Sequence, residues 1–310
     1  MAKVLLTGAS GFVGSHVLPA LLDAGHHVVA LCRSERVGAK VQSRIERGGE
    51  RLHVRVGDIE NEDSVVAAAT GCDAIVHLVA IPRDWSGGRE LDRVNHLGTA
   101  HVVAAAQRAG VRRFVHLGAL GVEERAGLNY ATSKARGERV VGASGLDYTI
   151  IKPSLIWGER DGFFNIVAAL VRVPAPVVPV PGNGKSRFQP VWVGDVARSI
   201  VTVLADPKGS VGRSYELGGP RYWTYAEITR EVARALNKRR LIVPMPVPLI
   251  ALVAGVSEAI RFPFPVATDQ LRQLALDNIG ALDAVERELG YVPVDMAGRL
   301  GYLQRKVSKQ

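Results

Sequence analysis

Residues 4–14 read Val4-Leu5-Leu6-Thr7-Gly8-Ala9-Ser10-Gly11-Phe12-Val13-Gly14, an apolar run followed by three glycines at a spacing of three. An amphipathic helical pattern continues to Gly25. In such a turn the first glycine permits a tight bend, the second lets a phosphate approach the backbone, and the third packs helix against strand. The N-terminus of the helix then suits a pyrophosphate. The alternative is an ordinary strand–helix turn, but the position directly after a first strand favours a dinucleotide site. The cofactor contacts predicted in this turn are Gly8, Ser10, Gly11, Phe12, Val13 and Gly14.

The end of the second predicted strand, residues 27–32, indicates which dinucleotide is preferred. NAD-binding units place an acid about 20 residues beyond the glycines, where it accepts from the ribose hydroxyls. Cys32 stands there in this chain, and Arg33 follows it. A guanidinium suits a 2′-phosphate. The sequence therefore predicts NADP(H), with NAD(H) as the second choice; the alternative for Arg33 is a solvated surface charge.

Composition excludes several classes of protein. The chain has 310 residues, enough for one large α/β unit and a smaller lobe, and its 47% apolar content excludes disorder. Two cysteines make no disulfide framework, which predicts a reducing, cytoplasmic location. Because the first predicted strand begins at residue 3, no signal peptide is expected. The net charge of +9 comes from scattered arginines without zinc-finger spacing or an RNP motif, so no nucleic-acid partner is expected.

Apolar runs alternate with helical patterns over residues 1–153, which predicts a doubly wound α/β fold (Rossmann) with a parallel sheet covered on both faces. This segment is the expected dinucleotide-binding domain. Pro19 lies inside the first helical pattern, where it should kink the helix or leave a carbonyl unpaired. The predicted strands are 3–7, 27–32, 52–56, 73–78, 112–118 and 147–152, and the predicted helices are 11–24, 61–70, 89–109 and 128–144.

Residues 154–310 are expected to form a smaller substrate or partner lobe that returns some elements to the main sheet. Residues 173–185 carry four prolines and Gly182-Asn183-Gly184, which indicates a loop over a cleft. Arg187 follows this stretch as a candidate anion contact, with surface charge as the equal alternative. Further elements are predicted at 194–205 (helix), 213–217 (strand), 224–236 (helix) and 267–276 (helix).

The most apolar window, residues 241–260, does not predict a membrane-spanning helix because it contains three prolines and Glu258. It follows Lys238-Arg239-Arg240. A basic cluster beside an apolar segment can rest on an anionic membrane surface, which would place the protein at the inner face of a membrane. The alternative, which we favour from the sequence, is that 241–260 packs into the core of its own lobe.

A candidate catalytic pair follows the fifth predicted strand. Tyr130-Ala131-Thr132-Ser133-Lys134 places a phenol and an ammonium one helical turn apart. The ammonium is expected to lower the pKa of the phenol and to hold the nicotinamide ribose. Tyr130 would then exchange a proton with the substrate while hydride moves at the cofactor. The histidines have no metal-ligand spacing, so no metal site is expected.

Motifs in the order of one known family span nearly the whole chain, and the sequence resembles the short-chain dehydrogenase/reductase superfamily in its extended and atypical NAD(P)-dependent epimerase/dehydratase branch. From Asp161-Gly162-Phe163-Phe164-Asn165 onward it is most similar to bacterial relatives of the nucleotide-binding accessory subunit of respiratory complex I. The motifs that carry the resemblance are residues 7–14, Gly57-Asp58-Ile59, His77-Leu78-Val79-Ala80, residues 94–99, Tyr130 with Lys134, Lys152-Pro153-Ser154, residues 188–197 and residues 215–219.

The resemblance implies further site residues. Asp58 and Ile59 would contact the adenine, Val79 and Ala80 the adenosine ribose, Lys134 the nicotinamide ribose and Pro153 the nicotinamide ring, while Asn95 would bond backbone near the active site. Asp58 has the alternative of capping the following helix, and Val79 and Ala80 that of plain core.

One departure from the family concerns catalysis. Its enzymes usually carry Ser or Thr at the end of the fifth strand, where Gly118-Ala119 stands here. Loss of one preorganised donor to an oxyanion costs on the order of 10²–10³ in rate. Thr132 and Ser133 are the nearest replacement hydroxyls, though neither has the expected spacing from Tyr130.

Two interpretations therefore stay open. In the first, which we favour, the chain is an NADP(H)-binding oxidoreductase-family protein, epimerase/dehydratase-like, with weak or unconventional catalysis by Tyr130 and Lys134 on a carbonyl, sugar-nucleotide or quinone-type substrate. In the second it is a non-catalytic NADPH-binding accessory or sensor protein linked to respiratory complex I or quinone metabolism. The sequence leaves the substrate and the oligomeric state open.

Overall fold

The computed structural model describes residues 1–45, 48–84, 86–246, 248, 249, 272, 274 and 276–305. The chain divides into two compact units. Unit 1 comprises Met1–Pro153 and Val193–Glu216, and unit 2 comprises Ser154–Trp192 and Leu217–Gln310. None of the described helices is long and apolar enough to cross a membrane.

Unit 1 is built on a seven-stranded sheet with the order β11-β6-β5-β4-β1-β2-β3. All neighbours from β6 to β3 pair in parallel, as repeated strand–helix–strand units require. The strand order reverses between β1 and β4, so their carboxyl ends form the point where ligands bind in sheets of this class. The strands are β1 (Lys3–Thr7), β2 (His27–Cys32), β3 (Leu52–Val56), β4 (Ala74–His77), β5 (Arg113–Leu117), β6 (Asp147–Pro153) and β11 (Arg213–Leu217).

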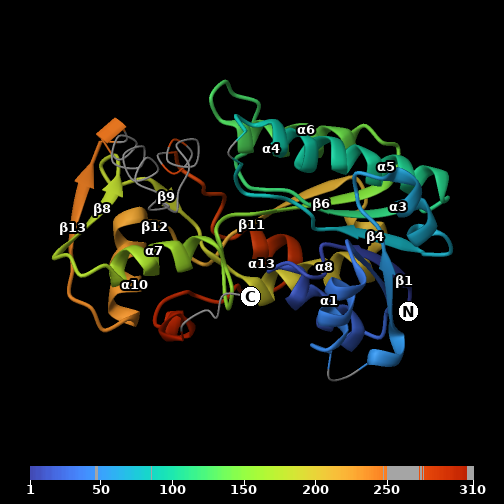
Figure 1. The fold of residues 1–310 in the computed structure, drawn as a ribbon, viewed down its shortest axis with the longest axis horizontal. Coiled ribbons are helices and arrows are strands. Elements are labelled where there is room, and N and C mark those ends of the chain that lie inside the picture. The colour runs from blue at the N-terminus through green and yellow to red at the C-terminus, as the bar shows by residue number, and fades with distance from the viewer. Residues whose placement is uncertain are drawn as a thin grey trace. The chain divides into compact units, whose positions relative to one another are not determined.

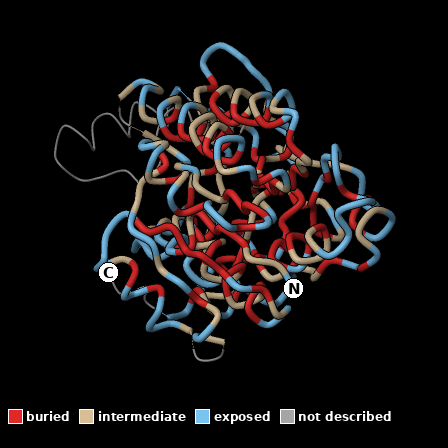
Figure 2. Tube along the Cα trace, turned by 90° about the vertical axis from the view of Figure 1, so that its right-hand side faces the viewer, coloured by how far each residue is buried: buried red, intermediate tan, exposed pale blue. Residues whose placement is uncertain are grey.

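Helices cover both faces of this sheet. In Figure 1, α3, α5 and α6 lie on one side and α1 and α8 on the other. The interior strands carry the β-branched and leucine side chains that such burial needs, and β4 is buried at every position. Figure 2 shows buried residues, in red, gathered in the interior of the trace and exposed residues, in pale blue, towards its periphery. The predicted doubly wound sheet is thus confirmed. The helical elements are α1 (Gly14–Asp23), α2 (Glu35–Gln42), η1 (Gly49–Arg51), α3 (Glu62–Ala69), α4 (Arg89–Leu91), η2 (Asp92–Leu97), α5 (Gly98–Arg108), α6 (Asn129–Gly142), α8 (Val193–Ala205) and α9 (Pro207–Ser210).

Unit 2 has its own core, in which the rings of Phe163, Phe188 and Tyr225 meet edge-on or tilted. Its strands form two-stranded pairs rather than one large sheet: β10 with β7, β12 with β9 and β13 with β8. The elements are β7 (Ile156–Trp157), α7 (Phe163–Arg172), β8 (Val177–Pro181), β9 (Arg187–Phe188), β10 (Val191–Trp192), β12 (Trp223–Thr224), α10 (Tyr225–Ala235), β13 (Leu241–Met245), α13 (Ala284–Leu289) and η3 (Leu300–Gln304).

Several sequence predictions need correction. The stretch 173–185 is not one loop, because Val177–Pro181 form β8 in parallel register with β13. A strand with a single partner leaves one edge free, so prolines that cannot donate are tolerated there. The helix expected at 89–109 is divided by the wider π-helical turn η2. The helices α2 and α7 were not predicted. Residues 250–260 lie outside the described residues, and so does most of the predicted helix 267–276.

Candidate nucleotide-binding site

The turn after β1 has the backbone geometry of a phosphate cradle. Gly8 adopts φ +80°, which side chains rarely allow, and its carbonyl accepts from the Gly11 N–H at 3.0 Å. A Cβ on Gly8 would lie 3.2 Å from the backbone of Leu78 and Val79, so the turn packs directly against the chain that leaves β4. The first glycine is therefore needed both for conformation and for close approach.

The third and second glycines have different surroundings. A Cβ on Gly14 would stand 2.1 Å from the Gly8 carbonyl oxygen, so α1 packs on β1 too closely for any side chain. A Cβ on Gly11 would meet only the Gly8 oxygen at 3.2 Å. Apart from that oxygen, a Cβ on Gly11 would have no close contact with the described residues other than its neighbours in the chain. The fold should therefore tolerate an added side chain better at Gly11 than at Gly14.

The N-terminus of α1 offers donors to that ligand. Val13 occupies the capping position and has no side-chain hydrogen bond to the helix. The first N–H groups of a helix need outside acceptors, and the dipole favours an anion. Ser10 is exposed beside the turn, while Phe12 packs edge-on against His16. The predicted turn residues therefore fit the pyrophosphate of a dinucleotide.

The end of β2 has no anionic acceptor. Cys32 is buried, and burial raises the pKa of its thiol, so the group stays neutral. Arg33 is exposed, and within the described part of the chain no carboxylate forms an ion pair with it. Ser34 caps α2 by accepting from the Val37 N–H at 3.3 Å. The arrangement presents a free guanidinium where NAD-binding units present an acid.

The predicted adenosine residues have separate structural roles. Asp58 does not cap α3, because Asn61 does so by accepting from the Ser64 N–H; Asp58 Oδ1 accepts from the Glu60 N–H at 3.1 Å. Ile59 belongs to the core, and Val79 packs partly against it. Ala80 is exposed, so the alternative that it is plain core is wrong.

Tyr130 and Lys134 lie on α6, but their electrostatics differ from the sequence prediction. The Lys134 side chain is buried, and its Nζ donates to the Leu117 carbonyl at 2.6 Å. Burial lowers the pKa of Lys134 to about 8, although Glu138 opposes the shift. Burial, with the charge of Glu138, raises the pKa of Tyr130 to about 12. The expected lowering of the phenol pKa by Lys134 is therefore wrong for this arrangement, because burial dominates the shift and the charge of Glu138 acts in the same direction.

Glu138 is the site residue that the sequence prediction missed. It follows Lys134 by one helical turn and is 8% exposed. Its Oε1 accepts from the Ala119 N–H at 3.0 Å, and its Oε2 forms an ion pair with Lys152 Nζ at 2.8 Å. A Cβ on Gly118 would lie 2.4 Å from Glu138 Oε1, so Gly118 makes room for the carboxylate. The i, i+4, i+8 spacing from Tyr130 is the signal that would have found it.

The two nearest replacement hydroxyls, those of Thr132 and Ser133 on α6, already have hydrogen-bond partners. Thr132 Oγ1 donates to the Arg125 carbonyl and accepts from its N–H. Ser133 Oγ donates to the Tyr130 carbonyl and accepts from Asn95 Nδ2 at 3.1 Å. Both hydroxyls serve the backbone or a neighbouring amide. The site keeps the phenol–ammonium pair without the usual third donor.

Asn95 holds the chain after β4 to the π-helical turn η2. Its Nδ2 donates to the Ile81 carbonyl at 3.0 Å, and its Oδ1 accepts from the Ile81 N–H at 2.8 Å. This matches the backbone-bonding role that the resemblance implied. Pro153 is buried at the end of β6, and its carbonyl accepts from the Leu120 N–H at 2.9 Å. These bonds fix the loops after β4 and β5.

The buried histidines of β4 and β5 do not form a metal site. The rings of His77 and His116 stack at 5.4 Å, and burial lowers the pKa of both. His77 bonds to the hydroxyls of Thr7 and Thr99. Over the residues that the structure covers, no group of three metal-ligating side chains occurs. In unit 2, Arg187 pairs with Asp277 at 2.7 Å, so its charge is already compensated.

Comparisons with known proteins also indicate an NAD(P)H-binding protein. A family model described as NAD(P)H-binding matches residues 8–207. The Arabidopsis thaliana "NADH dehydrogenase [ubiquinone] 1 alpha subcomplex subunit 9, mitochondrial" is 25% identical over 94% of this chain and 74% of its own. A Mycobacterium tuberculosis "3 beta-hydroxysteroid dehydrogenase/Delta 5-->4-isomerase" is 28% identical over 95% and 87%. A solved structure of the Streptomyces venezuelae dTDP-glucose 4,6-dehydratase, with NAD bound, has the same fold, with a TM-score of 0.74 at 23% identity over 97% of this chain and 94% of its own.

Proposed function

Because this chain belongs to the NAD(P)H-binding family, we propose that it is an NADP(H)-binding oxidoreductase-family protein with weak or unconventional catalysis. The substrate class proposed is a carbonyl, sugar-nucleotide or quinone-type compound. One combination of features supports the proposal: the glycine turn has the geometry of a dinucleotide cradle, whereas the site around Tyr130 lacks the usual hydroxyl donor. Glu138 binds the Ala119 N–H where related enzymes present a hydroxyl.

Different residues of unit 1 would bind different parts of the dinucleotide. The glycine turn and the N-terminus of α1 would hold the pyrophosphate, Arg33 the 2′-phosphate, and Lys134 the nicotinamide ribose. At pH 7 Lys134 is mostly protonated because its pKa is about 8, so it offers a cation despite its burial. The bound cofactor would supply or accept hydride.

Proton transfer by Tyr130 is the step of the proposed reaction that should be slow. A phenol with a pKa of about 12 is a poor base near neutral pH, and it must act as an acid without a neighbouring hydroxyl donor. Loss of one oxyanion donor costs on the order of 10²–10³ in rate. We therefore expect slower turnover than in an enzyme that has the tyrosine, the lysine and the Ser or Thr hydroxyl together.

The second candidate function is a non-catalytic NADPH-binding accessory or sensor protein linked to respiratory complex I or quinone metabolism. The same Ala119–Glu138 arrangement favours it, together with the likeness to a named complex I subunit. The two functions share the cofactor and differ in whether Tyr130 moves a proton.

Turnover measurements with point variants separate the two functions. We expect slow NADPH oxidation against at least one member of a panel of quinones, ketones and sugar nucleotides, and a higher rate in Ala119→Ser because the donor is restored. Tyr130→Phe should reduce the rate only modestly, since residues that act as a unit lose most of their effect with the first deletion. Its NADPH affinity should stay within a few-fold, whereas Lys134→Ala should weaken binding clearly. The matched control is Tyr148→Phe. It also removes a phenol hydroxyl, but from the start of β6, whereas Pro153 of the candidate site lies at the end of this strand.

Two results would contradict the proposed function. Brisk wild-type turnover that disappears in Tyr130→Phe would return the chain to the conventional enzymes. No turnover in wild type and in Ala119→Ser, with NADPH still bound, would favour the accessory or sensor function.

A further inference from the structure

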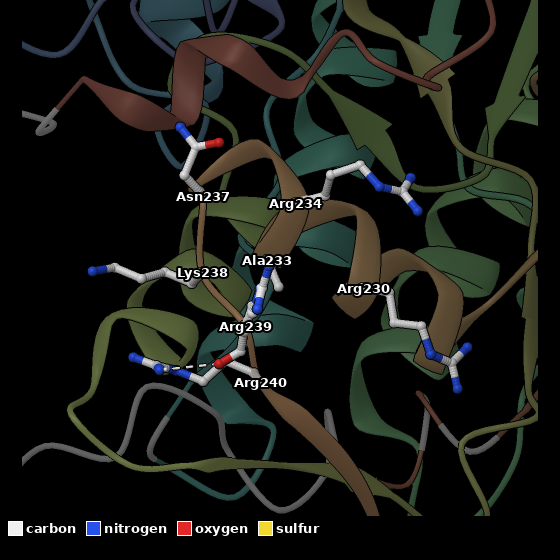
Figure 3. Close-up of a pocket in the computed structure, with 7 residues that line it drawn as sticks. All are labelled: Arg230, Ala233, Arg234, Asn237, Lys238, Arg239 and Arg240. Carbon is white, nitrogen blue, oxygen red and sulfur yellow. Dashed lines mark hydrogen bonds between the residues drawn. The ribbon is translucent and has the colours of Figure 1, made fainter.

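A strongly basic surface lies in unit 2, whereas the residues of the proposed nucleotide site belong to unit 1. A hollow of about 520 Å³ is bordered by the second half of α10 and the segment that leads to β13 (Figure 3). Among the described residues that line it, none is acidic and none is aromatic. The lining residues, here called the basic hollow, are Arg230, Ala233, Arg234, Asn237, Lys238, Arg239 and Arg240.

Most of this positive charge is not compensated. Arg234 pairs with Glu231, which is 4% exposed. The Arg240 guanidinium donates to the carbonyls of Val171 and Val173, which caps the end of α7 without neutralising the cation. Within the described part of the chain, no carboxylate forms a salt bridge with the other three cations, Arg230, Lys238 and Arg239.

The cations spread over a surface instead of converging on one point. Figure 3 shows Arg230 and Arg234 extending to one side of the hollow and Lys238 and Arg240 to the other. A single small anion would be held by donors that point at one position. A row of bases would need aromatic stacking partners, which the lining lacks. Spread charge suits a plane of many negative headgroups.

Exposed apolar side chains adjoin this charge. Leu241, the first residue of β13, is 64% exposed and pairs in register with Val177 of β8, which is 42% exposed. Val173, whose carbonyl holds Arg240, is 47% exposed. These three residues form the apolar rim. Cations beside exposed aliphatic side chains are the composition of surfaces that rest in the headgroup region of a bilayer.

We propose that the basic hollow and the apolar rim bind the surface of an anionic phospholipid bilayer. The cations would contact lipid phosphates and carboxylates, and the rim would enter the boundary of the acyl chains. Such a surface places the protein peripherally at the inner face of a membrane, where anionic lipids are concentrated. The proposal does not depend on the nucleotide site.

Co-sedimentation of the full chain with lipid vesicles tests it. Vesicles of phosphatidylcholine with about one-third phosphatidylserine should bind the protein, and pure phosphatidylcholine vesicles should not. The triple variant Arg230→Gln/Lys238→Gln/Arg239→Gln should bind about 100-fold more weakly, about fivefold for each cation. The matched control Lys40→Gln/Lys185→Gln/Lys208→Gln removes the same charge from exposed positions elsewhere and should bind as wild type does.

Two further measurements separate charge from apolar contact. Raising the salt concentration should weaken wild-type binding, because it screens the cations. Leu241→Thr should also weaken binding while keeping the salt dependence. Unchanged thermal melting and an unchanged response to NADPH would show that the variants fold.

Three outcomes would overturn the proposal: equal binding to both kinds of vesicle, no binding at all, or a folded triple variant that binds as wild type does. Tighter binding to poly(U) RNA than to the anionic vesicles would assign the surface to nucleic acid and overturn it as well.

Discussion

Glu138 shows how one buried residue changes the chemistry of its neighbours. Its carboxylate pairs with Lys152 and accepts from the Ala119 N–H. It raises the pKa of Tyr130 and counteracts the lowering of that of Lys134. The phenol is therefore kept protonated and the ammonium kept charged. A phenol that stays protonated is unsuited to base catalysis near neutral pH.

The glycine turn yields a paired prediction at single positions. In Gly11→Ala the fold should stay within about 1 kcal/mol of wild type, because φ is compatible and the added Cβ meets only one atom at 3.2 Å. NADPH binding should be lost, since the Cβ would occupy the place of the pyrophosphate. Gly14→Ala should instead destabilise the fold by about 3 kcal/mol or more, because its Cβ would stand 2.1 Å from backbone.

Thermal melts with and without NADPH measure both effects. Wild type should gain about 2.7 kcal/mol at a hundredfold excess over the dissociation constant. A ligand-induced rise that persists in Gly11→Ala, or a Gly14→Ala protein as stable as wild type, would show that the turn does not work as described.

At the level of elements, Asp161 joins the start of α7 to η3. Its Oδ1 accepts from the Phe164 N–H at 2.7 Å, and its Oδ2 accepts from the Tyr302 hydroxyl at 2.5 Å. These bonds lower the pKa of the carboxyl, but burial outweighs them and raises it to about 6. The folded protein therefore binds a proton between pH 4 and 6 that the unfolded chain has released.

Stability should consequently fall as pH rises through this range. The free energy of unfolding of wild type, relative to Asp161→Asn, should decrease by up to about 3 kcal/mol between pH 4 and pH 7. Asparagine keeps the shape of the side chain and does not titrate, so the difference between the two proteins removes the contribution of the other acids to the pH dependence. Denaturant titrations at several pH values measure it. A difference that does not change with pH would mean that Asp161 carries no desolvation penalty.

Most strands and several helices of unit 1 could be predicted because their hydrophobic periods are long and regular, whereas the short helix α2 was missed. The pattern of β1, β2 and α1 follows from apolar runs and glycine spacing. In β8 the prolines were a misleading signal, because the tolerance of Pro179 depends on pairing with the distant β13. The π-helical turn η2 could not be predicted, since the bonds from Asn95 to Ile81 join segments 14 residues apart.

For the molecule as a whole, the sequence predicts which residues make up the candidate nucleotide site, but it does not predict their electrostatics. Glycine positions and the Tyr130–Lys134 spacing are written in short motifs. The pKa values depend on burial and on Glu138, which only the packed α6 reveals. The sequence predicted that some later elements return to the main sheet, but that these are residues 193–216 depends on packing that no local pattern encodes.

Isothermal titration calorimetry with NADPH and NADH tests the central claim most directly. Wild type should bind NADPH at least tenfold more tightly than NADH, because Arg33 is free of carboxylate partners among the described residues and Cys32 supplies no anionic acceptor. Arg33→Ala should lose that preference and leave NADH affinity nearly unchanged. Equal affinities in wild type, or a preference that survives in Arg33→Ala, would contradict the account.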